Sequence, residues 1–122
     1  MPDLDLNGLD RNVNADPALV HRGRWVSLTF TLGIDDIDYL ITIQKGKIIN
    51  ITQRKLQTAA GRFSIRADAP SWRKHWQKIP QRDYHDIFAM LAKKLVDIDG
   101  DLLPLMQNLQ YFKDLISKNR ES

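Results

Sequence analysis

Residues 83–116 read DYHDIFAMLAKKLVDIDGDLLPLMQNLQYFKDLI, and this stretch decides the predicted fold. Apolar residues recur at helical spacing over 84–95 and again over 102–116, which predicts two amphipathic helices. Residues 95–98 form a predicted short strand, because valine and isoleucine there alternate with aspartate. The glycine-centred stretch 99–101 predicts a tight turn. The whole therefore reads as helix, strand, turn and helix, with two apolar helix faces that need a sheet to cover.

Each predicted helix has an aspartate at its start and a stripe of large apolar side chains. Asp83 and Asp101 are the expected N-caps, because a carboxylate accepts hydrogen bonds from the free N–H groups of a first helical turn. The first stripe contains Tyr84, Ile87, Phe88, Leu91 and Leu95. The second stripe contains Leu102, Leu105, Met106, Leu109, Phe112 and Ile116. We expect both stripes to face the core.

The chain before this stretch predicts a sheet. Residues 25–32, 39–44, 48–53 and 62–67 alternate between apolar and polar side chains, with the period of two that indicates a half-buried strand. Because the links between these four runs are short, we expect an antiparallel meander. The 95–98 strand is expected to join one edge of that sheet.

A short helix is expected after the fourth strand. Residues 68–71, Asp-Ala-Pro-Ser, are a helix-start signal, and Trp72 and Trp76 follow one turn apart on one face. In the third strand, Ile49 and Ile51 are expected on the same face. Strands first and helices second predict an α+β fold, with a five-stranded, mainly antiparallel sheet covered on one face by helices.

Two regions are expected along the chain: an irregular N-terminal arm over 1–24 and a single domain over 25–122. Within the arm, Asp16 as N-cap and Pro17 at the first helical position predict one short helical turn. No apolar run approaches the ~20 residues that a membrane-spanning helix needs. The chain contains no cysteine, and its acidic start lacks the apolar region of a secretory signal. We therefore expect a cytoplasmic protein.

Charge is distributed unevenly. Residues 45–94 contain twelve basic and three acidic side chains, a balance of +9, whereas residues 1–44 and 95–122 have balances of −4 and −2. A basic middle third can attract nucleic acid or an anionic membrane surface. The preferred interpretation is a solvated sheet face, since lysine and arginine also protect exposed strand edges.

No catalytic or metal-binding pattern is recognisable. His21, His75 and His85 lack the spacing of a helical metal site, so we expect surface or half-buried imidazoles. The D-x-D-G-D pattern of residues 97–101 is similar to the start of a calcium loop. Apolar residues, however, follow where the EF-hand needs its later acidic ligand, so a capped turn is preferred. We expect no enzyme, no metal and no cofactor.

Large, adaptable apolar side chains are numerous for a chain of 122 residues. They form either an ordinary packed core or the walls of an apolar pocket between sheet and helices, since such pockets are lined by aromatic, methionine and leucine side chains. The sequence leaves both interpretations open. The set comprises Trp25, Phe30, Phe63, Trp72, Trp76, Phe88, Met90, Met106 and Phe112.

The order of these elements resembles the sterol carrier protein type 2 (sterol-transfer) family over residues 25–116. The resemblance rests on FSIRAD at 63–68, before the two-tryptophan helix, and on LVDIDGD at 95–101, before the last helix. It implies a sterol-carrier-like domain that binds a sterol, fatty acid or acyl chain in an apolar cavity without catalysis. The family also occurs as accessory domains attached to enzymes, so the resemblance also allows a partner-docking role.

The expected ligand lies between the sheet and the last two helices. Its expected wall residues, which fall on the predicted inner faces, are Phe30, Ile41, Phe63, Trp76, Phe88, Leu91, Leu105, Met106 and Leu109. A basic rim of Arg62, Arg66, Arg73 and Lys74 is expected to meet a head group. The expected partner is a hydrophobic small molecule, with a membrane surface or a protein partner as further partners.

Three other functions stay open from the sequence. One is an accessory domain that docks a protein partner and has a filled core. A second is a small α+β enzyme, which needs a histidine and a carboxylate in one cavity. The third is a nucleic-acid-binding module that uses the basic residues of 45–94, but the chain lacks an aromatic-basic ribonucleoprotein motif and a glycine-rich clamp loop. Nucleic acid is therefore not the expected partner.

Overall fold

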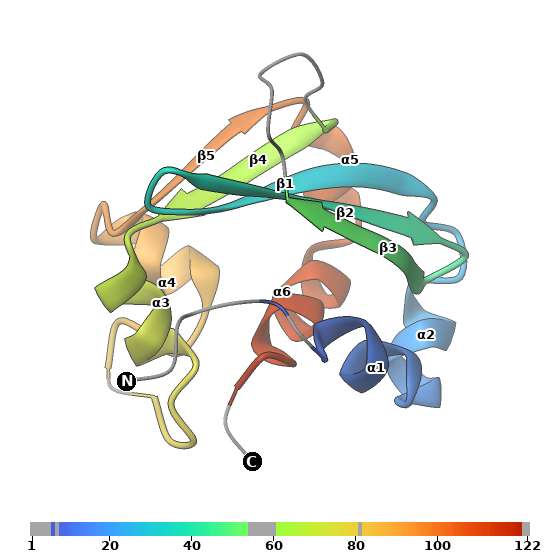
Figure 1. Cartoon of the computed structure of the whole chain (residues 1–122), viewed down its shortest axis with the longest axis horizontal. Coiled ribbons are helices and arrows are strands. Elements are labelled where there is room, and N and C mark those ends of the chain that lie inside the picture. Colours follow the sequence, from blue (N-terminus) through green and yellow to red (C-terminus); the bar gives the residue numbers. More distant parts are fainter. Residues whose placement is uncertain (1–5, 7, 54–60, 81, 121–122) are drawn as a thin grey trace.

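The computed structural model describes residues 6, 8–53, 61–80 and 82–120, and it has an α+β architecture. Five strands form one sheet in the order β3-β2-β1-β4-β5. The helices lie together on one face of this sheet, and the other face carries none of the described helices (Figure 1). The predicted fold class is therefore confirmed. The strands are β1 (Leu28–Ile34), β2 (Ile37–Gln44), β3 (Lys47–Gln53), β4 (Phe63–Ala67) and β5 (Val96–Gly100).

The predicted four-stranded meander is wrong at its last strand. β1, β2 and β3 are antiparallel neighbours, but β4 pairs in parallel with β1 in the centre of the sheet. This position stacks the Phe63 ring on that of Phe30, with ring centroids 5.2 Å apart. β5 pairs antiparallel with β4 at the edge opposite β3, as expected.

A β-bulge reverses part of the predicted face of β3. Thr42 pairs with Asn50 and Ile43 pairs with Ile48, so Ile49 is an extra residue on the bulged strand. An extra residue shifts the two-residue period by one. As a result Ile48 is buried at 3 % exposure, while Ile49 is 58 % exposed. The expected common face of Ile49 and Ile51 is therefore wrong.

Two short helices occupy half of the N-terminal arm, which was expected to be irregular. They are α1 (Leu9–Asn14) and α2 (Pro17–Arg22), and both lie beneath the sheet (Figure 1). The cap of α2 is as predicted, because Asp16 accepts a hydrogen bond from the Leu19 N–H. Scattered apolar residues hide the helical pattern, yet three of them are buried in the core: Leu9, Val13 and Leu19.

The helix at the start of the 83–116 stretch is shorter than predicted. It is α4 (Ile87–Ala92), and its N-cap is Asp86, whose carboxylate accepts from the N–H groups of Phe88 and Ala89. Asp83 instead adopts a φ of +73° in the preceding turn. The aspartate nearer to the apolar stripe therefore takes the capping role that was predicted for Asp83.

The predicted last helix is divided into α5 (Leu103–Gln107) and α6 (Leu109–Ser117). The break is at Asn108, whose side-chain amide donates to the Pro104 carbonyl at 2.9 Å. Asparagine favours such local bonds over a continuous helix. The apolar stripe therefore does not continue straight from α5 into α6, and residues of α5 need not face the core.

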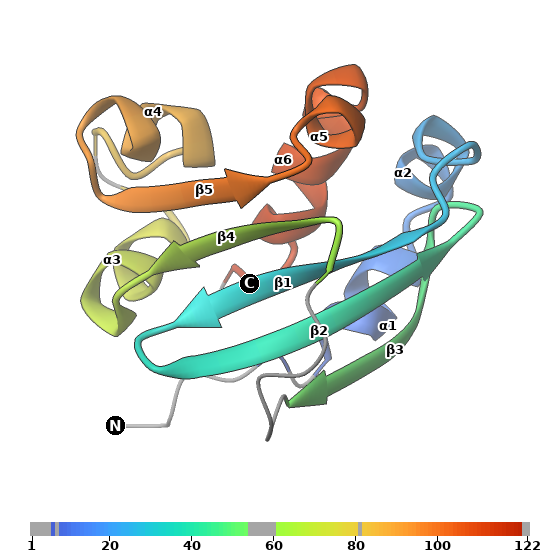
Figure 2. The same ribbon diagram turned by 90° about the horizontal axis from the view of Figure 1, so that it is seen from above.

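The remaining helix is α3 (Ala69–His75), capped by Asp68, which accepts from the Ser71 N–H at 2.8 Å. Seen from above, α3 and α4 lie at one end of the molecule and α1 and α2 at the other, with α6 between them (Figure 2). Within the described ranges, every helix is too short or too polar to cross a membrane.

Candidate ligand-binding interface between sheet and helices

Three phenylalanines from three elements form the centre of the inner apolar layer. Phe30 and Phe63 stack face to face, and Phe112 of α6 meets both at nearly right angles, with centroids 5.5 and 5.2 Å away. All three are at most 1 % exposed. Such edge-to-face contacts are favourable for aromatic rings. The sheet and α6 are thus in direct contact through aromatic side chains.

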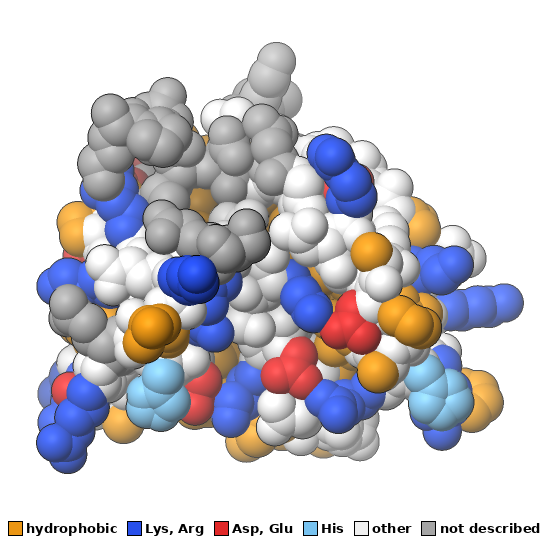
Figure 3. Space-filling model, turned by 90° about the horizontal axis from the view of Figure 1, so that it is seen from below, with side chains coloured by type: hydrophobic (Ala, Val, Ile, Leu, Met, Phe, Trp, Pro, Cys, Tyr) orange, Lys and Arg blue, Asp and Glu red, His pale blue; other side chains and the backbone are white. Residues whose placement is uncertain are grey.

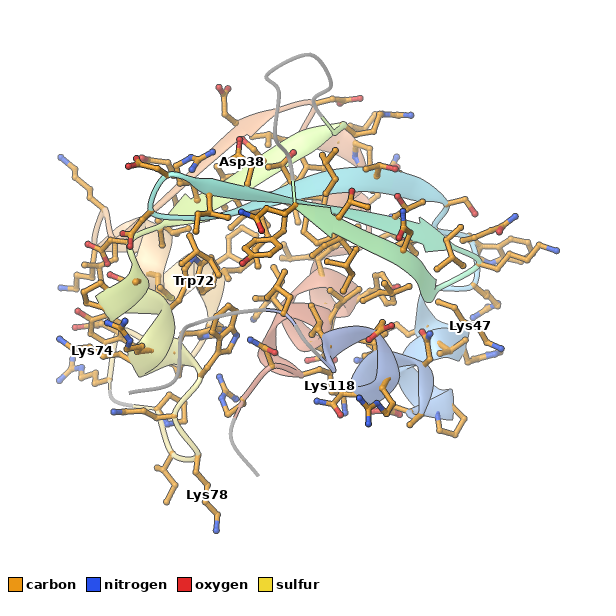
Figure 4. All side chains as sticks on the ribbon, in the orientation of Figure 1. Asp38, Lys47, Trp72, Lys74, Lys78 and Lys118 are labelled. Carbon is orange, nitrogen blue, oxygen red and sulfur yellow. The ribbon has the colours of Figure 1, made fainter. Side chains whose placement is uncertain are left out.

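A second aromatic group lies where α3 meets the sheet and α6. Trp72 and Trp76 stack with centroids 4.9 Å apart. The Trp72 indole N–H donates to the Gly33 carbonyl at 2.8 Å, and the Trp76 indole N–H donates to the Ile116 carbonyl at 2.9 Å. Figure 4 shows Trp72 beneath the sheet, on the side of the helices. These bonds fix both indoles and satisfy both of their N–H groups.

His75 completes the tryptophan group, and its placement differs from the sequence prediction. It was expected at the surface or half-buried, but it is fully buried. Its Nδ1 lies 2.7 Å from the Tyr84 carbonyl oxygen. Burial lowers the pKa of His75 to about 4, so the ring is neutral at neutral pH. The signal in the sequence was its position on the same face of α3 as Trp72 and Trp76.

Tyr111 connects α6 to the turn between β2 and β3. Its hydroxyl donates to the Gly46 carbonyl at 2.8 Å, and burial raises its pKa, so it stays protonated. The Lys45-Gly46 turn brings this carbonyl into the core, with φ values of +52° and +82°. The polar end of Tyr111 is therefore occupied within the protein.

The nine predicted wall residues divide into a buried group and a partly open group. The buried group is at most 3 % exposed and contains Phe30, Ile41, Phe63, Trp76 and Leu105. Phe88 and Leu109 are half-buried. Leu91 and Met106 are exposed by 39 % and 57 %, although the pattern places them on inner faces. The break at Asn108 turns Met106 outward, and the early end of α4 leaves Leu91 at its last turn.

The predicted basic rim is not a single feature. Arg66 lies on the helix-free face, where it forms an ion pair with Asp38 and donates to the Asp35 carbonyl at 2.7 Å. The Lys74 ammonium lies 5.0 Å from the centre of the Tyr84 ring, on the helical side. Figure 4 shows Asp38 and Lys74 on these two sides of the sheet.

The other two residues of the predicted rim are also apart. Arg62, beside β4, lies 3.5 Å from Asp101, and Arg73 is half-buried on α3.

Basic and acidic side chains are interleaved on the helical side of the protein (Figure 3). Arg22 pairs with Asp114, Lys118 lies 2.7 Å from Asp16, and Lys113 lies 3.4 Å from Asp86. This arrangement differs from the continuous basic stripe that favours nucleic acid. In the part of the chain that the structure describes, no three histidine or carboxylate side chains gather in a way that would hold a metal ion.

Several surface clefts lie outside the inner layer. One, of about 520 Å³, lies between the start of α1 and β3, and its lining includes Leu6, Asp10 and Ile51. Another, of about 360 Å³, lies between α2 and α6. A third, of about 210 Å³, includes Asp38, Arg66 and Asp99 in its lining. These polar clefts do not coincide with the space between the sheet and α4 to α6 that the sequence indicated.

Comparison of the structure with solved structures gives a consistent result. The chain superposes on the crystal structure of sterol carrier protein 2 with a TM-score of 0.75 and 15 % identity, over 94 % of this chain and 92 % of the other. It matches a conserved hypothetical protein of Thermus thermophilus, linked by its name to sterol carrier protein, with a TM-score of 0.64, 13 % identity and coverage of 94 % and 85 %.

A third match is the ubiquinone synthesis protein UbiJ-SCP2, with a TM-score of 0.61, 16 % identity and coverage of 93 % and 85 %. No protein-family model matches the chain, and no curated protein matches its sequence. The likeness in three dimensions nevertheless extends over nearly the whole chain. The protein has the fold of sterol carrier protein 2, as its resemblance in sequence implied.

Proposed function

We propose that the protein binds a lipid or another hydrophobic molecule between the sheet and helices α4 to α6, without catalysing a reaction. The observation that carries this proposal is the fully apolar layer of Phe30, Phe63 and Phe112 under a sheet with the sterol carrier protein 2 fold. An acyl chain or sterol body needs such a surface, because it gains free energy by leaving water. The sterol, fatty acid or acyl chain expected from the sequence all belong to this class.

The ligand enters below β5, between α4 and α5. These helices lie at opposite ends of β5 (Figure 2). α5 is five residues long and has one buried residue, Leu105. Leu103 and Met106 of the same helix are 63 % and 57 % exposed. Displacement of this helix exposes one buried side chain, that of Leu105, and its exposed apolar side chains then cover the ligand.

The free energy gained by burying a long ligand chain is larger than that of the three ring contacts. An aromatic pair contributes about 0.5–1.5 kcal/mol beyond its burial, so the three contacts among the phenylalanines contribute roughly 1.5–4.5 kcal/mol. Roughly ten methylenes removed from water contribute about 8 kcal/mol at about 0.8 kcal/mol each. A long chain therefore offsets the loss of these contacts, whereas a short one does not.

A second candidate function is supported by the same contacts. Because Phe30, Phe63 and Phe112 touch one another, the core is packed in this conformation. A packed core also suits an accessory domain that docks a protein partner on its outer surface. Saturable binding of a lipid distinguishes the first function from the second.

Cytoplasmic location is part of the proposal and is supported by the absence of cysteine from the sequence. The proposed partners are a hydrophobic small molecule and the membrane or protein surface that supplies it. The exposed side chains of α5 suit contact with such a surface.

The test uses mid-chain brominated lipids, which quench tryptophan fluorescence on contact. A brominated fatty acid and the corresponding brominated fatty alcohol are titrated against Met106→Trp and Ile49→Trp. These positions are matched in exposure, at 57 % and 58 %, but Ile49 lies on the β3 bulge, away from α5. The unsubstituted protein supplies the signal of its three native tryptophans, which is subtracted.

We expect saturable quenching at micromolar lipid for Met106→Trp and little additional quenching for Ile49→Trp. Absence of saturable quenching with both lipids contradicts lipid binding and favours the docking function. Equal quenching of both variants shows general adsorption to the surface and contradicts the proposed site.

A further inference from the structure

One buried polar atom at the edge of the inner layer has no hydrogen-bond partner among the described residues. The Nδ1 of His75 bonds to the Tyr84 carbonyl oxygen, and a carbonyl only accepts, so Nδ1 carries the ring hydrogen. The other nitrogen, Nε2, is then an acceptor. It is buried and has no hydrogen-bond partner among the residues that the structure describes. A buried acceptor without a partner costs about 1–3 kcal/mol.

The electrostatic surroundings keep this nitrogen unprotonated. Burial has the largest effect and lowers the pKa of His75, and the positive charge of Arg120 acts in the same direction. The negative charge of Asp86 and the bond to Tyr84 raise the pKa of His75, but they offset the lowering only in part, and the pKa remains at about 4. Near neutral pH, Nε2 therefore presents a lone pair and no hydrogen.

The other polar groups of the inner layer are already engaged. The indole N–H groups of Trp72 and Trp76 and the hydroxyl of Tyr111 each donate to a backbone carbonyl of the protein. The tryptophan rings lie beside the imidazole, with centroids 5.7 and 6.4 Å from it. His75 Nε2 is thus a buried acceptor on an imidazole that lies beside two tryptophan rings, with Arg120 and Asp86 near enough to act on its charge.

The second buried atom without a partner among the described residues is Nε of Arg73. Arg73 is two positions from His75 on α3, which is about 200° around the helix axis. Arg73 as a whole is half-buried, whereas His75 is fully buried. Arg73 therefore does not face the same space as the imidazole, and it would prefer an anion.

Building on the proposed function, we propose that His75 Nε2 accepts a hydrogen bond from the hydroxyl group of the ligand, and that the ligand class is a lipid alcohol. A hydroxyl satisfies the buried acceptor, and its hydrocarbon body packs against the aromatic layer. An ionised carboxylate has no hydrogen to donate and would place its charge against a lone pair. An ether likewise accepts only.

The test compares three ligands with the same chain length: hexadecan-1-ol, hexadecanoate and methyl hexadecyl ether. Each is delivered from cyclodextrin at pH 7.5, and its affinity is measured by displacement of the brominated probes. We expect the alcohol to bind about tenfold more tightly than the ether, the difference made by one hydrogen bond of about 1.4 kcal/mol. We also expect the alcohol to bind more tightly than hexadecanoate.

Two substitutions at His75 connect this preference to the imidazole. His75→Phe keeps a ring but removes the acceptor, so alcohol and ether should bind equally. His75→Gln retains an acceptor close to the position of Nε2 and should recover part of the preference. The ligand comparison on the unsubstituted protein stands even where a variant fails to fold, as circular dichroism would show.

The outcomes separate this inference from the proposed function. Equal affinity for alcohol and ether in the unsubstituted protein overturns the inference but leaves lipid binding intact. Tighter binding of hexadecanoate than of hexadecan-1-ol also overturns the inference, and it indicates that the ligand head group contacts a cation such as Arg73. Failure of all three ligands and both probes to bind overturns the inference together with the proposed function.

Discussion

Trp76 donates its indole N–H to the carbonyl oxygen of Ile116 at 2.9 Å and so connects α3 to α6 beneath the sheet. Both residues are nearly inaccessible to water, at 3 % and 1 % exposure. This bond ties α3 to α6, which is one of the helices that enclose the proposed ligand site. Its strength therefore affects both the stability of the fold and the opening of the site.

Replacement of Trp76 by Phe should lower the free energy of unfolding by about 1–3 kcal/mol. The substitution removes a buried hydrogen bond and leaves unfilled volume beside Trp72. Urea denaturation followed by far-ultraviolet circular dichroism measures the change. Trp25→Phe is the control, since Trp25 is 84 % exposed and its replacement should change stability by less than about 0.5 kcal/mol. Equal effects of the two substitutions would contradict the described packing.

The sequence was sufficient to predict the faces of the strands where the two-residue period is unbroken. Phe30, Ile41 and Phe63 are buried as the alternation of their strands requires. Trp76 is buried for a similar reason, since helical spacing places it beside Trp72. At these positions a local period alone determines the side that faces the core.

The other features of the fold depend on contacts between distant residues, which a local sequence period does not reveal. The bulge at Ile49 is an extra residue opposite β2, and it has no signature in the alternation of β3 itself. The parallel pairing of β4 with β1 joins residues more than thirty positions apart, such as Leu32 and Ile65. The outward position of Met106 follows from a side-chain bond of Asn108 that competes with the helix.

The stability of the protein should decrease with acidity in a range set by His75. Its pKa is about 4 in the folded protein and about 6.5 when unfolded, so the unfolded state binds a proton more readily. The contribution of the neutral His75 ring to the free energy of unfolding is fully present above pH 6.5, and it decreases as the pH falls from 6.5 to 4. The slope is about 1.4 kcal/mol per pH unit.

Chemical denaturation at several pH values between 4.5 and 7 measures this slope. His75→Gln should flatten the dependence over this range, and His21→Gln, at an exposed histidine, is the control. An equally steep slope in His75→Gln would show that another group is responsible.

The two adjacent residues Leu105 and Met106 should differ strongly in their effect on stability. Leu105 is 1 % exposed and is the buried residue of α5, whereas Met106 is 57 % exposed. Leu105→Ala should therefore cost about 2–5 kcal/mol, and Met106→Ala less than about 0.5 kcal/mol. Thermal unfolding of the two variants provides the comparison. Equally large effects of the two substitutions would indicate a continuous helix with both side chains on its buried face, and would contradict the break at Asn108.

The bulge in β3 predicts opposite tolerance at the two neighbouring isoleucines. Ile48→Thr introduces a hydroxyl into the core and should destabilise the protein by about 1–3 kcal/mol. Ile49→Thr changes a side chain that is 58 % exposed and should be nearly neutral. Unfolding in urea distinguishes the two. The reverse order would indicate a regular β3 without the extra residue.

The most direct measurement of lipid binding between sheet and helices is an isotope-filtered nuclear Overhauser experiment on the labelled protein with unlabelled hexadecan-1-ol. Lipid binding in this layer predicts contacts from the chain methylenes to the rings of Phe30, Phe63 and Phe112, which belong to the sheet and α6. Contacts confined to exposed side chains such as Trp25, with none to the three phenylalanines, would contradict it.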